Sequence, residues 1–318
     1  MSLSGRALRH TARQWLAAGR PAIVVQVDDI KGSTPRETGT RMLVAADAVL
    51  GTIGGGHLEW QAIDLARHLL AEATPTTPAT GPRLQKTYPL GPTLGQCCGG
   101  VVVLGFEPLN HTSLAQWPDS PARFHLELHG AGHVGQAIVR LLCDLDCTVR
   151  WIDERGDDAQ ATGDASGRSM GDAPGLPDPA WLATLPPHIH WTPTEAADHE
   201  VAHAPAHACH LVLTHRHDLD LRIISAVLQR SQQQHDVRFA GLIGSQTKRA
   251  KFLHRLEAMG LSSRTLAGLT CPIGLPELSG KEPAVIAVSV VAQLLLQCPA
   301  PAMPTAPTAP AIATQATP

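Results

Sequence analysis

Apolar and polar positions in the first third of the chain follow both strand and helix periods. Short β-rich runs alternate with glycine-containing turns, and apolar side chains recur once at helical spacing. An amphipathic pattern over residues 1–20 predicts a helix ahead of them. The next elements, in order, are a strand at 22–30, two short strands within 42–56, a helix at 57–73, and strands at 83–90 and 100–109. They predict a small α+β domain over residues 1–110.

The rest of the chain alternates strands with helices. Residues 124–153 have the order strand, glycine loop, helix, strand, and Asp153 closes the second strand. Further strand and helix pairs are predicted at 210–231 and 237–259, with a last helix at 283–297. This alternation predicts an α/β fold with a parallel, doubly wound sheet. The boundaries we expect are a linker at 111–122, a Rossmann-like domain at 123–298 with an irregular connection at 155–187, and a disordered Pro, Ala and Thr tail at 299–318.

Composition narrows the class of protein. The chain has 318 residues, 43% of them hydrophobic, and a formal net charge of −3. Dispersed basic residues and few aromatics argue against a nucleic-acid partner, and no apolar run is long enough to span a bilayer. The start has no signal-peptide pattern, and an odd count of 7 cysteines is typical of reduced thiols. We therefore expect a cytoplasmic protein.

A GxGxxG pattern follows the strand that opens the second domain. Gly130, Gly132 and Gly135 precede a helix, whose N-terminus offers free N–H groups to a phosphate. The same glycines also occur where a turn only packs tightly against a sheet. His133, inside the loop, either binds a ligand or caps the helix.

Two further loops have anion-binding chemistry. Arg36 and Arg41 lie in a glycine-containing loop after the first strand, and guanidinium groups bind anionic oxygens in two-pronged fashion. Gly55 and Gly56 lead into the first turn of a helix, with His57 directly after them. The alternatives are a solvated surface loop and a sharp turn.

Adjacent thiols mark a glycine-rich loop between two predicted strands. Cys97 and Cys98 stand before Gly99 and Gly100, and accessible thiols suit a soft metal or a sulfur atom in transit. The alternative is a pair of small buried apolar residues. We expect a structural role for the other five cysteines: Cys143, Cys147, Cys209, Cys271 and Cys298.

Histidines gather near the end of a later strand, where ligands of open α/β sheets bind. His215, His217 and Asp220 have the chemistry of a zinc or iron site. No HExxH helix or CxxC pair accompanies them, so a full set of metal ligands is missing.

Seven motifs appear in one order from about residue 21 to residue 297, and together they closely resemble the XdhC/CoxI family, the xanthine dehydrogenase accessory proteins. They read "GSTPRETGTRMLV", "GTIGGGHLEWQA", "LGPTLGQCCGGVV", "HGAGHVGQA", "LTHRHDLD", "GLIGSQTKRAKFLHRL", and "CPIGL" with "KEPAVIAVSVVAQLL". CoxI-like members carry cysteine where His57 stands, which favours the xanthine dehydrogenase branch.

The resemblance implies an N-terminal XdhC/CoxI domain and a C-terminal Rossmann-like domain. It also implies a protein that binds the molybdenum cofactor, cooperates with a cysteine desulfurase during sulfuration, and inserts the cofactor into apo-xanthine dehydrogenase. A homodimer is expected. Cys97 and Cys98 are the expected molybdenum contacts. The expected cofactor-binding residues are Arg36, Arg41, Gly55, Gly56, His57, Gln96, Cys97, Cys98, Gly130, Gly132, His133, Gly135 and His215.

Three hypotheses therefore stand after the sequence has been considered. The first is a carrier and maturation chaperone without turnover of its own, because no nucleophile, base and orienting residue stand together. The second is an NAD(P)-dependent oxidoreductase, in which Asp153 would bind the ribose. The third is a zinc or iron enzyme.

Overall fold

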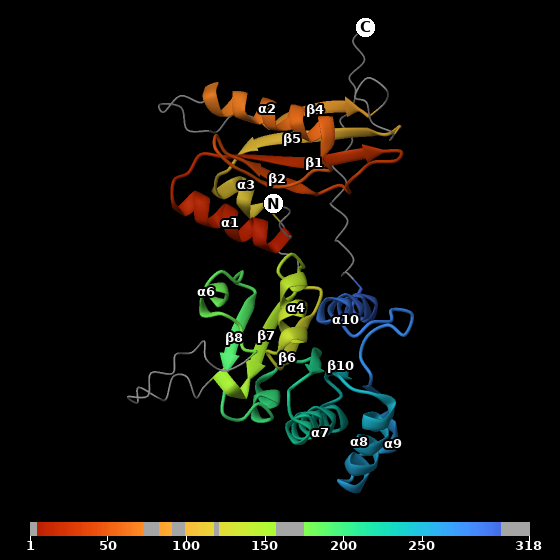
Figure 1. Cartoon of the computed structure of the whole chain (residues 1–318). Helices are drawn as coiled ribbons and strands as arrows, with labels where there is room; N and C mark the ends of the chain where they lie inside the picture. The colour runs from red at the N-terminus through yellow and green to blue at the C-terminus, as the bar shows by residue number, and fades with distance from the viewer. Residues whose placement is uncertain (1–4, 73–82, 91–98, 118–120, 157–174, 300–318) are drawn as a thin grey trace, which may run out of the picture.

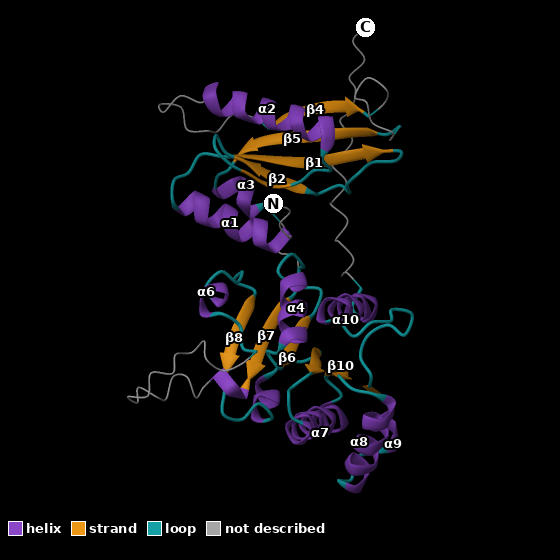
Figure 2. Cartoon of the chain, viewed as in Figure 1, coloured by secondary structure: helices purple, strands orange, loops and turns teal. Residues whose placement is uncertain are grey.

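The computed structural model describes residues 5–72, 83–90, 99–117, 121–156 and 175–299. Its strands form two separate sheets, one in the N-terminal domain (residues 5–117) and one in the C-terminal domain (residues 121–299) (Figure 1). Helices cover both faces of each sheet (Figure 2). None of the helices within the described residues is long and apolar enough to cross a bilayer.

The N-terminal domain is built on a 5-stranded antiparallel sheet of order β3-β2-β1-β5-β4. Helix α2 packs its apolar stripe against one face, and α1 and α3 pack against the other. The elements are α1 (Gly5–Ala17), β1 (Ile23–Lys31), β2 (Arg41–Val44), β3 (Val49–Gly51), α2 (Gly56–Glu72), β4 (Leu84–Pro89), β5 (Val101–Pro108) and α3 (His111–Ala115).

The C-terminal domain holds a 6-stranded parallel sheet of order β11-β10-β9-β6-β7-β8. Numbered from its own first strand, this is the 3-2-1-4-5-6 order of dinucleotide-binding folds, with the switch point between β6 and β9. The elements are β6 (His125–His129), α4 (His133–Leu142), β7 (Thr148–Asp153), η2 (Glu154–Gly156), α6 (Pro179–Leu182), β8 (Ile189–Pro193), η3 (His199–His203), β9 (Ala208–Val212), α7 (His217–Gln234), β10 (Val237–Leu242), α8 (Gln246–Ala258), α9 (Ser263–Ala267), β11 (Leu269–Thr270) and α10 (Pro283–Gln297).

The expected fold class is confirmed: a small α+β region precedes a Rossmann-like parallel sheet. The structure adds order where the sequence indicated none. The expected linker contains α3, which Asn110 caps and which packs on α1. The expected irregular connection contains α6, and strand β8 follows it. The tail from residue 300 lies outside the described residues.

The two domains meet at the N-terminal edge of the parallel sheet. Arg123, Thr148 and His188 lie at or just before the starts of β6, β7 and β8, and they line the same cavity as α1 and residues 36–41. In Figure 1 the arrowheads of β7 and β8 point away from the N-terminal domain. The carboxyl edge of the sheet, where ligands of such folds bind, therefore faces away from the N-terminal domain.

Candidate functional site

The glycine loop after β6 is tightly packed on one side and open on the other. A β-carbon on Gly130 would clash with the Leu213 carbonyl, and one on Gly135 would clash with the Gly130 carbonyl. A β-carbon on Gly132 would meet nothing within 4 Å. Gly132 is also the N-cap residue of α4 and supplies no side-chain acceptor to the first N–H groups of that helix. The loop is shaped for an anionic group to approach the backbone at Gly132.

Asp153 lies at the tip of β7, where a ribose-binding carboxylate would stand. Both of its oxygens are engaged within the chain. The Ala131 N–H donates to Oδ2 at 2.7 Å, and Arg155 donates through its backbone N–H and its guanidinium. Burial opposes ionisation of Asp153, but the Arg155 and Ala131 donors outweigh it and lower the pKa of the carboxyl. Asp153 therefore stays ionised and holds the glycine loop in place.

An ion pair joins the segments that follow β9 and β10, the two strands next to β6 across the switch point. Lys248, on α8, donates to the buried Asp220 carboxylate at 2.6 Å and to the Ile243 carbonyl at 2.8 Å. Thr214 donates to the same carboxylate through its N–H and its hydroxyl. The motifs "LTHRHDLD" and "GLIGSQTKRAKF" are thus held together by one charged contact. The sequence analysis did not single out Lys248, although a lysine in a helical first turn beside a strand end was a usable signal.

The structure gives no support to the zinc or iron hypothesis. His215 and His217 are exposed, and Asp220 is committed to Lys248 and Thr214. Across the described ranges, no three His, Cys, Asp or Glu side chains stand close enough together to hold a metal ion. His215 does lie on the carboxyl edge of the sheet, on the same edge as the glycine loop.

Glycines bring the loops of the N-terminal domain together at one edge of its sheet. A β-carbon on Gly54 would lie 2.5 Å from Pro35 Cγ, and one on Gly100 would lie 2.7 Å from the Lys31 carbonyl oxygen. Gly54 has φ +126°, so glycine is needed there for its backbone as well as for the contact. The loop between β1 and β2 (residues 32–40, the arginine loop) therefore lies between the turn before α2 (residues 52–55, the glycine turn) and the start of β5.

Glu59 holds the glycine turn in shape. One oxygen of its carboxylate accepts the N–H groups of Ile53 and Gly55 at 3.1 and 2.9 Å and the Thr52 hydroxyl at 2.5 Å. His57, directly after the turn, is exposed and stacks on Trp60 with ring centroids 5.6 Å apart. Trp60 is itself 63% exposed. The glycine turn thus lies beside two exposed, stacked rings, those of His57 and Trp60.

Gln96, Cys97 and Cys98 lie outside the described residues. The described residues on either side of them meet, because the Leu90 N–H donates to the Gly100 carbonyl at 2.8 Å. Gly100 itself lies against the carbonyl oxygens of Lys31 and Ser33, at the start of the loop that holds Arg36.

The other five cysteines are all described, and four of them are buried. Burial raises the pKa of the Cys147 thiol to about 12, so it stays protonated. Cys209 and Cys298 lie with their sulfur atoms 3.4 Å apart in the core of the C-terminal domain. Cys143 is partly exposed and donates to the Val139 carbonyl. These positions fit the structural role expected for them.

The expected site residues fall into two groups within one chain. Arg36, Gly55, Gly56 and His57 lie near the loop ends that flank the double cysteine. Gly130, Gly132, His133, Gly135 and His215 lie at the carboxyl edge of the parallel sheet. The length of β6, about 16 Å at 3.3 Å per residue, separates that edge from the N-terminal domain. Arg41 faces the cavity between the domains.

Comparison with known proteins adds a match over most of the chain. The model of the XdhC and CoxI family matches residues 15–79, and the model of the XdhC Rossmann domain matches residues 126–294. YqeB of Escherichia coli strain K12, described as uncharacterized, is 26% identical over 281 residues. That match covers 86% of this chain but only 43% of YqeB, so the chain spans less than half of that relative.

A solved structure shares the fold. It is the crystal structure of a xanthine dehydrogenase from Bacillus halodurans, with a TM-score of 0.65 and 16% identity, and the match covers 93% of this chain and 96% of that one. At that identity the likeness concerns the fold alone. Because the model of the XdhC Rossmann domain alone matches more than half of the chain, the chain belongs to the XdhC family.

Proposed function

We propose that this protein is a maturation factor for a molybdenum enzyme of the xanthine dehydrogenase type. It binds the molybdenum cofactor, holds it while a cysteine desulfurase supplies sulfur, and inserts it into the apo-enzyme. In this proposal the protein is a carrier without turnover of its own and works in the cytoplasm. Family membership supports the accessory role.

The observation that carries the proposal is the convergence of three glycine-rich loops at one edge of the N-terminal sheet. Gly54 packs on Pro35, and Gly100 packs on the Lys31 carbonyl, at the end of the segment that holds Cys97 and Cys98. Thiolates suit a soft metal and can also carry a persulfide sulfur. These glycines let the loops approach one another closely at this edge. The proposal therefore assigns molybdenum and its incoming sulfur to this edge.

The exposed pair of His57 and Trp60 suits the flat part of such a ligand. Aromatic rings favour offset stacking on planar groups, and both side chains lie next to the glycine turn. Arg36 is exposed close by and carries a charge for an anionic oxygen.

The Gly130–Gly135 loop of the C-terminal domain needs a separate explanation. Within one chain, the parallel sheet separates it from the end of the N-terminal sheet where Gly54 and Gly100 lie, which we call the thiol edge. The expected homodimer offers a way to unite them. The Gly132 loop of one copy can face the thiol edge of the other copy. The N-terminus of α4 would then meet the phosphate of the cofactor.

The alternative function is an NAD(P)-dependent oxidoreductase. The strand order and the open space at Gly132 favour it. The engagement of Asp153 by Ala131 and Arg155 disfavours it, since a ribose would have to displace an internal ion pair.

Binding measurements on the full chain separate the two functions. The protein is incubated with isolated molybdenum cofactor and, in a parallel sample, with NADH, and each is passed through a desalting column. The proposal predicts that the cofactor stays with the protein and NADH does not. Tight retention of NADH without retention of the cofactor would overturn it.

A further inference from the structure

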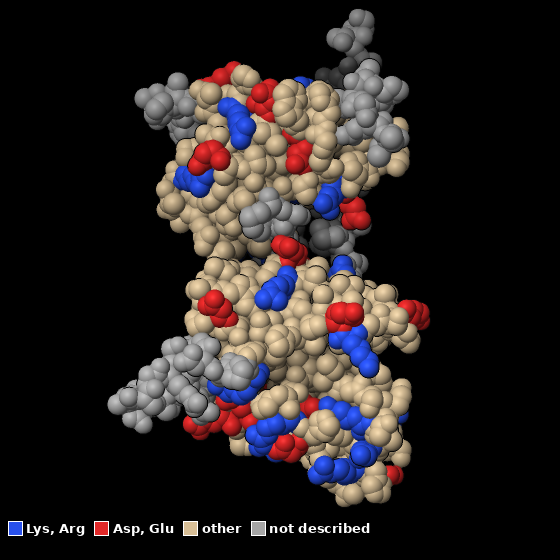
Figure 3. Space-filling view, viewed as in Figure 1, with Lys and Arg blue, Asp and Glu red and all other residues tan. Residues whose placement is uncertain are grey.

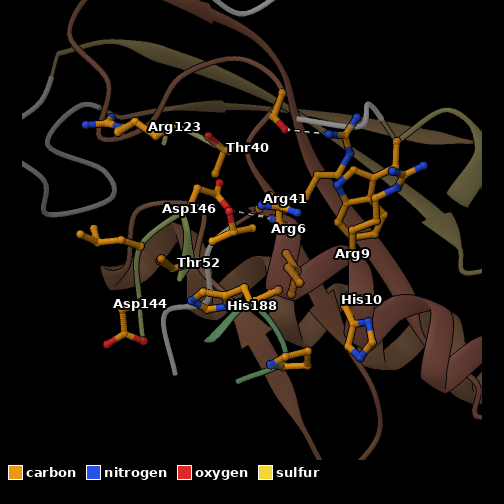
Figure 4. Close-up of a pocket in the computed structure, with 18 of the residues that line it drawn as sticks. Arg6, Arg9, His10, Thr40, Arg41, Thr52, Arg123, Asp144, Asp146 and His188 are labelled. Carbon is orange, nitrogen blue, oxygen red and sulfur yellow. Dashed lines mark hydrogen bonds between the residues drawn. The ribbon is translucent and has the colours of Figure 1, made fainter. Parts of the chain in front are cut away.

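The cavity between the two domains shares Arg36 and Arg41 with the expected site residues, and the rest of its lining was not singled out from the sequence. It has a volume of about 710 Å³, within the range of small-molecule sites in proteins. One wall comes from α1 and residues 36–41, and the other comes from the segments that precede β6, β7 and β8 (Figure 4). A ligand there would contact both domains at once.

Its lining is strongly basic. Among the described residues, 6 arginines face the cavity against 3 carboxylates. In Figure 3 the molecule narrows to a waist between the domains, and basic and acidic side chains both lie on each side of it. The arginines are Arg6, Arg9, Arg13, Arg36, Arg41 and Arg123, and the carboxylates are those of Glu37, Asp144 and Asp146.

Arg41 is the most informative of these arginines. Its guanidinium donates to the Gly39 carbonyl at 3.1 Å and lies 5.3 Å from the centroid of the Trp117 ring. Burial, and then repulsion from Arg83, lower the pKa of Arg41 to about 10. Arg83 is already paired with Asp28 and Glu107, whereas no carboxylate within the described ranges pairs with Arg41. Arg41 is therefore a partly dehydrated cation whose burial Glu107 and Asp28 offset only in part, and an anion in the cavity would stabilise it further.

Two further guanidinium groups reach the cavity from other elements. Arg6, on α1, has a buried Nη1 that finds no hydrogen-bond partner in the described part of the chain. Arg123 lies just before β6, where its backbone N–H donates to the Asp146 carbonyl at 2.8 Å. In Figure 4 its guanidinium points away from Arg6 and Arg41. Burial lowers the pKa of His188 even though its Nε2, 3.2 Å from the Leu142 carbonyl, has an acceptor that favours the protonated ring, so His188 adds no charge at neutral pH.

We infer that this cavity binds the phosphate or pyrophosphate group of a nucleotide-sized ligand through Arg6 and Arg41. Guanidinium forks match phosphate oxygens in pairs, and these two come from α1 and from the start of β2. The proposal does not depend on the maturation role. Two sources have this chemistry: the phosphate end of the molybdenum cofactor, and a free nucleotide.

Calorimetric titration of the full chain with inorganic pyrophosphate and with ADP tests the inference. We expect binding that weakens with added salt, since charge contacts supply it. Arg41→Gln and, separately, Arg6→Gln should each weaken pyrophosphate binding at least ten-fold. Arg6→Gln guards against a packing effect at Trp117. Arg264→Gln, on the exposed surface of α9, is the matched control and should change nothing.

The glycine loop is the competing site for the same probe, so Gly132→Asp belongs in the series. Pyrophosphate binding that Gly132→Asp abolishes and Arg41→Gln leaves intact would place the anion at the carboxyl edge and overturn the inference. Absence of pyrophosphate and ADP binding would overturn it as well.

Retention of isolated cofactor by Arg41→Gln identifies the source. Loss of cofactor together with pyrophosphate supports the cofactor phosphate as ligand, and loss of pyrophosphate and ADP alone supports a nucleotide. A wild-type chain that retains cofactor but binds neither probe would contradict this inference and leave the maturation role standing.

Discussion

Gly135 lies so close to the Gly130 carbonyl that a β-carbon does not fit, whereas Gly132 faces open space. Gly135→Ala is therefore expected to lower the free energy of unfolding by about 1–3 kcal/mol, the usual cost of overpacking. Gly132→Ala is the matched control and should leave it unchanged within about 1 kcal/mol, the cost separating the two residues at a helix start. Urea denaturation measures both. Equal stability of the two variants would contradict the packing described for this loop.

Cys97 and Cys98 were singled out from the sequence, and they lie outside the described residues. Replacement of Cys97 and Cys98 by serine should weaken cofactor retention more than ten-fold, because a hydroxyl is a poor soft-metal ligand and cannot carry a persulfide. Cys97 is expected to matter more, since Cys98 runs directly into Gly99 and the next strand. Retention on a desalting column and the rate of apo-xanthine dehydrogenase activation are the readouts.

Cys143→Ser is the control for that experiment. Cys143 is partly exposed on α4, and a serine hydroxyl can keep its contact with the Val139 carbonyl. Retention and activation at the original level in the Cys97→Ser, Cys98→Ser double variant would show that the pair is structural.

Helices α7 and α8 are tied to the sheet by the buried pair of Asp220 and Lys248. Lys248→Met would leave the Asp220 carboxylate buried without its charged partner, and a broken buried pair costs about 3–5 kcal/mol. The expected result is a matching loss in the free energy of unfolding in urea. Adding Asp220→Asn to that variant should recover part of the loss, and a double variant as unstable as the sum of the single ones would contradict the pairing.

Sequence periodicity predicted most elements but missed those that tertiary contacts create. Strand β8 has only Ile189 fully buried in "IHWTP", because it is an edge strand, and its pattern therefore lacks strand alternation. Helix α3 is only five residues long, and its Asn110 cap and its packing on α1 stabilise it more than any apolar period. The strongly periodic helices over α2, α7 and α10 were predicted to within a few residues.

At the scale of the whole molecule, the chemistry of single loops was readable and their arrangement was not. The sequence singled out Arg36 and Arg41 as anion binders, and the structure has both of them at one cavity. Arg6 and Arg123 share that cavity, yet they are separated from Arg41 by 35 and 82 residues along the chain. The Gly130–Gly135 loop and the thiol edge likewise lie apart because of the way the two domains meet. No local sequence pattern predicts that arrangement.

The central claim is that this chain carries the molybdenum cofactor to a xanthine dehydrogenase. The most direct test loads the full chain with isolated, sulfurated cofactor, removes what is unbound, and adds apo-xanthine dehydrogenase. The account predicts that enzyme activity appears, and that it appears faster than with an equal amount of free cofactor. Activation no faster than with free cofactor, from a chain shown to be folded and loaded, would contradict the claim.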